Sequence, residues 1–444
     1  MSEKQMEIER KKMRTDIKIP QKAVNITAFI ILCLMSLEPL KGVFVRFIEL
    51  EDVYENFFLK SNLARGLGLI ALVVGAFFII MREKVSLVGT LKDIYYKKPW
   101  NICLTLVLLW AFVSYGFSKG KYISMYGDAF RYEGLIAYIA YAGFFGLASL
   151  LKSERLKTVW VHFTIAVSTV LAICSLISYY GGNKYILTYM NDKGHGTTGL
   201  AATFLQYNHY AYYLSMIILL LAGLFLTEKK KVRKAAYAVL LGFHQFVLAQ
   251  NGTRGGYVAV FTALILLTVL AKKKGQTNAK EIIIMWIICV LFSIISKTFL
   301  ERLLSIFMDT SHIFKGVDAD RAGSGRWKLW RYTLWITSEH PVIGCGPNMS
   351  YYFMSAKGLP DMPHNEYFQH LCELGIPGGG LYIGGLLLLF IDRVKKIKNL
   401  STITMIIGCA AAAYAVSAFF GVTTPLVLPF FFILLGLSKE EATK

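Results

Sequence analysis

Apolar runs of about 20 residues recur along this 444-residue chain, and short charged segments separate them. A helix needs about 20 mostly apolar residues to cross the hydrocarbon core of a bilayer. The chain is 55% hydrophobic, which is more than a soluble globular protein of this size usually carries. The pattern predicts an all-α integral membrane protein with about twelve transmembrane helices, near residues 24–40, 62–81, 100–118, 134–151, 157–179, 208–226, 234–250, 255–271, 281–299, 376–391, 402–420 and 424–437.

These spans predict four parts of the chain. Residues 1–22 are charged and contain no apolar core, so we expect a cytoplasmic tail there and no signal peptide. Residues 23–300 hold the predicted transmembrane helices 1–9. Residues 301–375 are the long hydrophilic stretch between spans, and we expect a large extracytoplasmic catalytic loop with amphipathic helices. Residues 376–444 hold transmembrane helices 10–12 and a short cytoplasmic tail.

The formal net charge of +20 follows this predicted topology. With the amino terminus in the cytoplasm, 30 of the 48 Lys and Arg residues fall within the inner segments or at their edges. The clearest inner runs are residues 228–234, 272–274 and 392–398. The positive-inside rule therefore places both termini in the cytoplasm of a multi-pass plasma-membrane protein. The excess charge is a topology signal, so we expect contact with membrane lipids and no binding of nucleic acid.

The polar segment 344–380, rich in Gly and Pro, carries the best candidate for a catalytic base. His364 and Asn365 precede a helical pattern that Gly375 ends, and Pro377 can open the next helix. A neutral imidazole can accept a hydroxyl proton near neutral pH. We therefore expect His364 to act as a general base at the outer membrane face, with Asn365 orienting the ligand or the imidazole.

Four arginines in the predicted outer segments are candidate anion ligands. Arg254 lies in AQNGTRGGY, where glycines allow backbone N–H groups to approach a phosphate or pyrophosphate. Arg326 and Arg331 lie in GSGRWKLWRYTLW, which predicts an amphipathic interfacial helix. Arg131 is a weaker candidate, because a nearby carboxylate offers it a structural ion pair. For Arg254, Arg326 and Arg331 an anchoring role at the membrane interface is the alternative.

The other polar groups give weaker signals. His209 opens a span in FLQYNHYAYYLSM, and it is either a second site histidine or, more commonly at such a place, a hydrogen-bonded structural group. Asp318 and Asp320 are the nearest approach to an acidic metal motif, and we expect no metal site from them. No P-loop is present, so we expect neither nucleotide nor other cofactor. Cys345 and Cys372 share the large polar region, and whether they pair stays open.

Three segments carry a family resemblance: TRGGY, GSGRWKLWRYTLWITSEHPVIGCGPNMS and HNEYFQHLCELGIPGGG. Together with FLQYNHYAYYLSM and the Arg131 segment, they resemble the O-antigen ligase and polymerase superfamily over roughly residues 120–395. The resemblance implies a GT-C type glycosyltransferase that joins a glycan on undecaprenyl pyrophosphate to an acceptor hydroxyl, without metal or nucleotide. It implies His364 as the base and Arg254, Arg326 and Arg331 as ligands of the departing pyrophosphate. Family members often carry Arg or Ser where this chain has the glycines after Arg254.

Several functions remain open after this resemblance. A ligase passes the finished glycan to a lipid, protein or glycan acceptor, whereas a polymerase passes it to another lipid-linked repeat unit. The HN motif and the twelve predicted spans favour the ligase. A transporter or flippase of lipid-linked sugars is the alternative from another class, and it would show broken spans in repeat-related positions. A purely structural scaffold would leave the outward arginines and histidines without a role.

Overall fold

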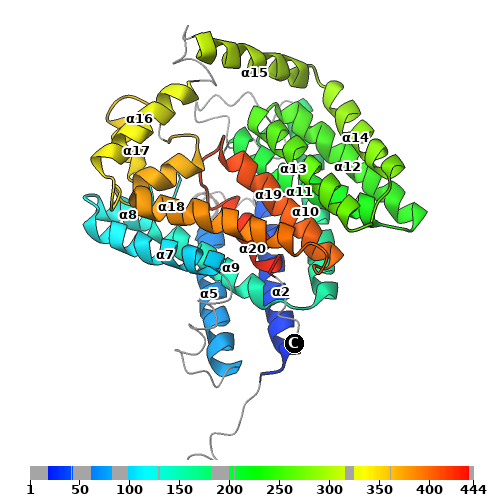
Figure 1. The fold of residues 1–444 in the computed structure, drawn as a ribbon, viewed down its shortest axis with the longest axis horizontal. Coiled ribbons are helices and arrows are strands. Elements are labelled where there is room, and N and C mark those ends of the chain that lie inside the picture. Colours follow the sequence, from blue (N-terminus) through cyan, green and yellow to red (C-terminus); the bar gives the residue numbers. More distant parts are fainter. Residues whose placement is uncertain are drawn as a thin grey trace, which may run out of the picture.

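A computed structural model describes residues 19–41, 43, 62–82, 99–128, 131–181, 200–204, 206–315, 325–360 and 362–439. These residues form helices and no β-strand (Figure 1). The longer helices are α2 (Gln21–Leu37), α5 (Asn62–Arg82), α7 (Pro99–Phe117), α9 (Leu135–Leu150), α10 (Glu154–Tyr180), α11 (Tyr207–Thr227), α12 (Lys231–Asn251), α13 (Arg254–Lys273), α14 (Ala279–Ile294), α15 (Lys297–Lys315), α16 (Arg326–Glu339), α18 (Glu366–Lys395), α19 (Thr402–Ala418) and α20 (Leu428–Leu437). The short helices are α8 (Lys121–Tyr126) and α17 (Ser350–Ser355), with a 3-10 turn at Glu38–Leu40.

Seven helices of the described residues are long and apolar enough to cross a membrane. They are α2 with the 3-10 turn that follows it, α5, α7, α10, α11, α13 and α18, and three shorter apolar helices, α9, α19 and α20, accompany them. The prediction of an all-α membrane protein is thus confirmed. Each predicted span overlaps a helix, but the count of twelve crossings stays a prediction. The span predicted at 281–299 is interrupted, because α14 ends at Ile294 and α15 begins at Lys297.

Helix α11 is the central helix of the bundle, and it packs against α12, α13 and α19 (Figure 1). Every residue from Asn208 to Leu226 is buried. A helix that is apolar all round needs such a position, because it has no face to offer to water. Its polar first turn is buried as well, which brings His209 and Asn208 inside the protein.

Helix α18 is kinked at Gly375, where φ is 70° and ψ is 176°. A side chain at this position would collide with the Val342 carbonyl oxygen, so the close approach requires glycine. The carbonyls freed by the kink are hydrogen-bonded from α7: Ser114 Oγ donates to the Glu373 oxygen at 2.7 Å and Trp110 Nε1 to that of Leu374 at 2.8 Å. The predicted break at this glycine is confirmed.

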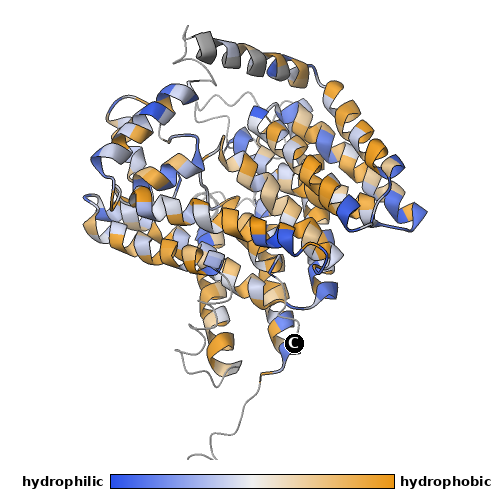
Figure 2. Ribbon diagram, viewed as in Figure 1, coloured by the Kyte–Doolittle hydropathy of each residue, from blue (hydrophilic) through white to orange (hydrophobic). Residues whose placement is uncertain are grey.

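Helices α16 and α17 pack beside the first half of α18 and form a second, smaller core. Figure 2 shows this region as more hydrophilic than the apolar helices of the main bundle. Helix α16 buries one face, including Leu329, Thr333 and Ile336, and leaves Leu334 and Trp335 largely exposed. This arrangement agrees with the amphipathic pattern of its sequence. The predicted tail 1–22 lies mostly outside the described residues, and Asp318 and Asp320 lie outside them.

Candidate functional site

His364 lies in the tight turn that enters α18. Its φ is +53°, a left-handed conformation that few residues without glycine's freedom adopt. Asn365 caps the helix, because its side-chain Oδ1 accepts the backbone N–H of Phe368 at 3.0 Å. Strained backbone of this kind is concentrated at functional sites, where the surrounding structure holds it in place. The predicted position of the imidazole at a helix start is confirmed.

Glu366 holds this turn in place from inside the protein. Its carboxylate is fully buried and accepts hydrogen bonds from the hydroxyls of Tyr382 and Tyr414. Tyr382 belongs to the second half of α18 and Tyr414 to α19, so one carboxylate joins three segments. The sequence analysis missed these three residues. The acidic residue directly after HN was visible as a helix-start signal, but its tyrosine partners lie 16 and 48 positions away.

Arg131 and His209 form a buried pair beside this turn. Arg131 Nη1 lies 3.2 Å from His209 Nε2, and the two residues are 1% and 0% exposed. A guanidinium can only donate, so Nε2 accepts and the imidazole is neutral with its proton on Nδ1. Among the described residues, His209 Nδ1 has no hydrogen-bond partner. His364 is close enough to exert an electrostatic effect on His209.

The Arg131 segment is itself held by hydrogen bonds. The Arg131 backbone N–H donates to Asp128 Oδ1 at 3.0 Å, and the Asp128 N–H donates to the side chain of Asn348. Glu133 takes a different partner, the hydroxyl of Tyr141. Asp128 therefore contacts Arg131 through the Arg131 backbone, and the Arg131 guanidinium contacts His209.

Arg326 approaches the same place from α16. It is the first residue of that helix, and both Arg326 and Arg131 are close enough to act on the phenol of Tyr212. Tyr212 follows His209 by three residues, so the two side chains share a face of α11. The Tyr212 hydroxyl donates to the Phe420 carbonyl oxygen at 2.7 Å.

Arg254 is the first residue of α13, and its Nη1 donates to Ser305 Oγ on α15 at 3.1 Å. The two glycines after it serve helix packing. A Cβ on Gly255 would lie 2.7 Å from the Phe420 Cβ, and one on Gly256 would lie 3.0 Å from the Ala211 Cβ. Helices α11 and α13 therefore begin side by side against Phe420, and the amino-terminal ends of both helices favour an anion there.

The segment 419–420 is the wall that these helix starts share. Phe420 contacts the starts of α13 and α11, as described above. The Phe419 ring lies 5.3 Å from that of Trp330 on α16 and 6.4 Å from that of Phe368 on α18, measured between ring centroids. Three helices that carry predicted site residues, α11, α13 and α16, are thus joined to α18, which follows His364, around one short segment.

Arg331 is placed differently from the other arginines. Its neighbour Trp330 faces α18 and Phe419, whereas the Arg331 side chain is exposed. Arg131 contacts His209, and His364 and Arg326 act electrostatically on His209 and Tyr212 of the same helix. The start of α13, which carries Arg254, lies against Phe420. Arg331 lies on the exposed side of α16.

Glu373 and Gln369, in the first half of α18, belong to a buried network of polar side chains. Glu373 accepts a hydrogen bond from Ser350 of α17 and another from Gln369. Burial raises the pKa of Glu133 well above its ordinary value, with the charges of Glu366 and Glu373 adding to this effect. Burial of this kind favours the protonated, neutral form of a carboxyl.

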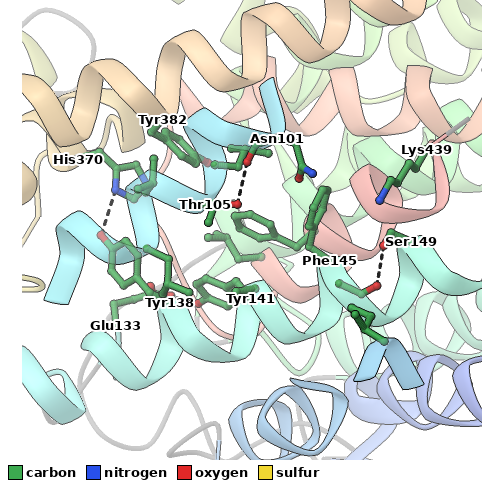
Figure 3. Close-up of a pocket in the computed structure, with 18 residues that line it drawn as sticks. Asn101, Thr105, Glu133, Tyr138, Tyr141, Phe145, Ser149, His370, Tyr382 and Lys439 are labelled. Carbon is green, nitrogen blue, oxygen red and sulfur yellow. Dashed lines mark hydrogen bonds between the residues drawn. The ribbon is translucent and has the colours of Figure 1, made fainter. Parts of the chain in front are cut away.

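A cavity of about 270 Å³ opens beside this network (Figure 3). Glu133, Tyr138 and His370 line one end of it, and the Tyr138 hydroxyl lies 3.0 Å from His370 Nδ1. Among the described residues, no group of three or more His, Cys, Asp or Glu side chains is arranged to hold a metal ion.

The model of the O-antigen ligase family matches residues 236–383. A search of the curated proteins found no match. The matched segment runs from α12 into α18 and includes Arg254, Arg326, Arg331, His364 and Asn365. The family suggests an O-antigen ligase or polymerase-type function in the assembly of surface polysaccharides. Residues 236–383, about a third of the chain, are thus similar to the O-antigen ligase family.

Proposed function

We propose that the protein is a membrane glycosyltransferase that moves a glycan from undecaprenyl pyrophosphate to an acceptor hydroxyl at the outer face of the plasma membrane. The observation that carries the proposal is the convergence of two histidines and two arginines, His364, His209, Arg131 and Arg326, at the start of α11. A base and several cations are what this reaction needs, since the pyrophosphate bond already activates the sugar.

In the proposed reaction, His364 accepts the proton of the acceptor hydroxyl. The oxygen of that hydroxyl attacks the anomeric carbon of the sugar on the donor. The bond from that carbon to the pyrophosphate oxygen breaks, and negative charge grows on the leaving group. Arginines placed in advance stabilise this charge without reorganisation. Arg254, Arg326 and Arg131 act in this way, and Arg331 holds the donor from the exposed side of α16.

Two further groups orient the substrates. Asn365 fixes the turn that carries the imidazole, because its own side chain caps α18. His209 is neutral in its contact with Arg131, and its Nδ1–H offers a hydrogen bond to a ligand oxygen. No metal ion or nucleotide enters the proposed mechanism.

The proposed acceptor is a lipid, protein or glycan, as in a ligase. The alternative is a polymerase that joins lipid-linked repeat units, and it uses the same residues. The choice depends on what occupies the acceptor position, and the shared motifs do not differ between the two.

The test is a mass analysis of products from purified protein, a lipid-linked repeat unit and candidate acceptors. Transfer of the glycan off the carrier supports a ligase, and growth of the glycan on the carrier supports a polymerase. If no glycosidic bond forms and the lipid-linked sugar instead crosses a proteoliposome membrane, the protein is a transporter and the proposal is wrong.

A further inference from the structure

Two cysteines meet where the turn after α16 touches the first half of α18. The sulfur atoms of Cys345 and Cys372 lie 3.7 Å apart, and the residues are 7% and 0% exposed. The backbones on both sides are in register, because the Cys345 N–H donates to the Cys372 oxygen and the Gly346 N–H to that of Glu373, both at 3.0 Å.

The surroundings of the two sulfur atoms are apolar. Leu329, Met349 and Met354 belong to the same small core. Burial raises the pKa of the Cys345 thiol well above its ordinary value. The thiolate is the reactive form, so this thiol is inert once the core has closed. A bond between the two sulfur atoms must therefore form during folding, as α18 docks and before water is excluded.

We propose that Cys345 and Cys372 form a disulfide bond that closes the loop carrying His364. The inference rests on the outward orientation in the proposed function, because disulfides persist in oxidising compartments outside the cytoplasm. The sulfur atoms approach from contact distance to a bond of about 2.05 Å. The two thiols lose two protons and two electrons as the bond forms. The disulfide of a thiol oxidoreductase takes them up by exchange and becomes a dithiol.

The loop that this bond closes contains α17, the turn at His364 and the cap at Asn365. Closing such a loop removes conformations of the unfolded chain, and it also limits local opening of the strained turn. The bond would fasten the entrance of α18 to the segment that follows α16.

The first experiment is peptide mapping. Cells are quenched with N-ethylmaleimide, and the purified protein is digested without reductant. A cross-linked pair of peptides that contain Cys345 and Cys372, separated by reduction, supports the bond. Alkylation of both residues in unreduced protein overturns it.

The second measurement is the melting temperature, followed by tryptophan fluorescence. We expect the melting temperature to fall by about 5 °C or more in Cys345→Ser, in Cys372→Ser and in the double variant. The three decreases should be nearly equal, because either single change removes the whole bond. Reductant should lower the melting temperature of the wild-type protein to the value of these variants. Cys103→Ser, a half-buried position on α7, is the control that should keep its response to reductant. Additive losses that do not respond to reductant overturn the proposal.

A third measurement separates this inference from the proposed function. Tyr352 is 56% exposed on α17, so Tyr352→Cys in the double variant gives a reporter thiol. If an impermeant maleimide labels this thiol in intact cells, the loop faces outward as proposed. If Cys345 and Cys372 are nevertheless free in the wild type, the disulfide is overturned and the orientation is not. Absence of labelling in intact cells, with labelling after lysis, overturns the orientation and the disulfide with it.

Discussion

At the scale of single residues, the site is defined by charge and by backbone strain. His364 takes a left-handed conformation at the mouth of α18, and a neighbouring imidazole, His209, is held neutral by a guanidinium. A neutral base beside fixed cations is suited to removing a proton while a leaving group gains negative charge. Each of these residues can be tested separately.

The first prediction concerns the base. His364→Ala should lower glycan transfer by roughly 10²–10⁴-fold, the usual contribution of general base catalysis. Expression and membrane insertion should stay near normal. The measurement is product formation by purified protein. His162→Ala is the control, since His162 is exposed and contacts Thr158 and Tyr237 on another part of the molecule. Full activity of His364→Ala would remove this residue from the mechanism.

The second prediction concerns the shape of a cation. Arg254→Lys keeps the charge but loses the planar guanidinium, which binds two phosphate oxygens at once. Transfer should fall roughly tenfold or more, as for the loss of a charged hydrogen bond. Arg233→Lys, at an exposed position on α12, is the matched control and should not change the rate. Unaltered transfer in Arg254→Lys would make this arginine an anchor only.

At the scale of elements, the entrance and the kink of α18 determine where the base lies. The helix begins at a turn fastened by Glu366 and changes direction at Gly375. Helix α7 supplies the donors for the carbonyls at the kink, and α19 supplies a tyrosine for the entrance. The position of the imidazole therefore depends on helices that contribute no residue to the proposed chemistry.

The third prediction tests the carboxylate at the entrance. Glu366→Leu leaves two buried tyrosine hydroxyls without their acceptor, which should cost about 1–3 kcal/mol for each group. The melting temperature and the transfer rate should both fall. Glu339→Leu, at the exposed end of α16, is the control for loss of an acidic residue. A Glu366→Leu protein as stable and active as the wild type would contradict the anchoring role.

The fourth prediction tests the kink. Gly375→Ala should destabilise the protein by at least about 1–3 kcal/mol, because alanine at this φ is strained and its Cβ would meet the Val342 oxygen. Gly380→Ala lies in the same helix with open space around it, so it should be neutral or slightly stabilising. The comparison is made by thermal unfolding in detergent. Equal melting temperatures for the two variants would refute the argument.

At the scale of the whole molecule, the central burial of α11 brings distant segments together. Helices α12, α13 and α19 surround it, and its amino-terminal end receives residues from α13, α16 and the turn before α18. The site therefore forms only when the bundle is complete. Its orientation in the membrane stays a prediction from the basic inner segments.

The fifth prediction tests that orientation. An epitope inserted after Gly275, in the basic turn after α13, should be hidden in intact cells and accessible after permeabilisation. An epitope after Gly358, in the turn after α17, should be accessible in intact cells. Both glycines have open space around them, so the insertions should be tolerated. The reverse pattern of accessibility would place the candidate site in the cytoplasm and contradict the proposed function.

The local features of the chain could be predicted from the sequence because they depend on neighbours in the sequence. The apolar runs predict the helices, Asn365 predicts a helix start, and Gly375 predicts its break. The same local logic failed at residues 281–299, where a continuous apolar pattern hides the boundary between α14 and α15.

Only the tertiary structure decided which polar groups meet. Arg131 and His209 are 78 residues apart, and Glu366 and Tyr414 are 48 apart. Sequence spacing carries no information on such contacts, because they depend on how whole helices pack around α11. The sequence by itself determined an all-helical membrane protein with a base at the start of a helix. Packing alone decided that the Arg131 guanidinium meets the His209 imidazole and that the Cys345 and Cys372 sulfur atoms lie 3.7 Å apart.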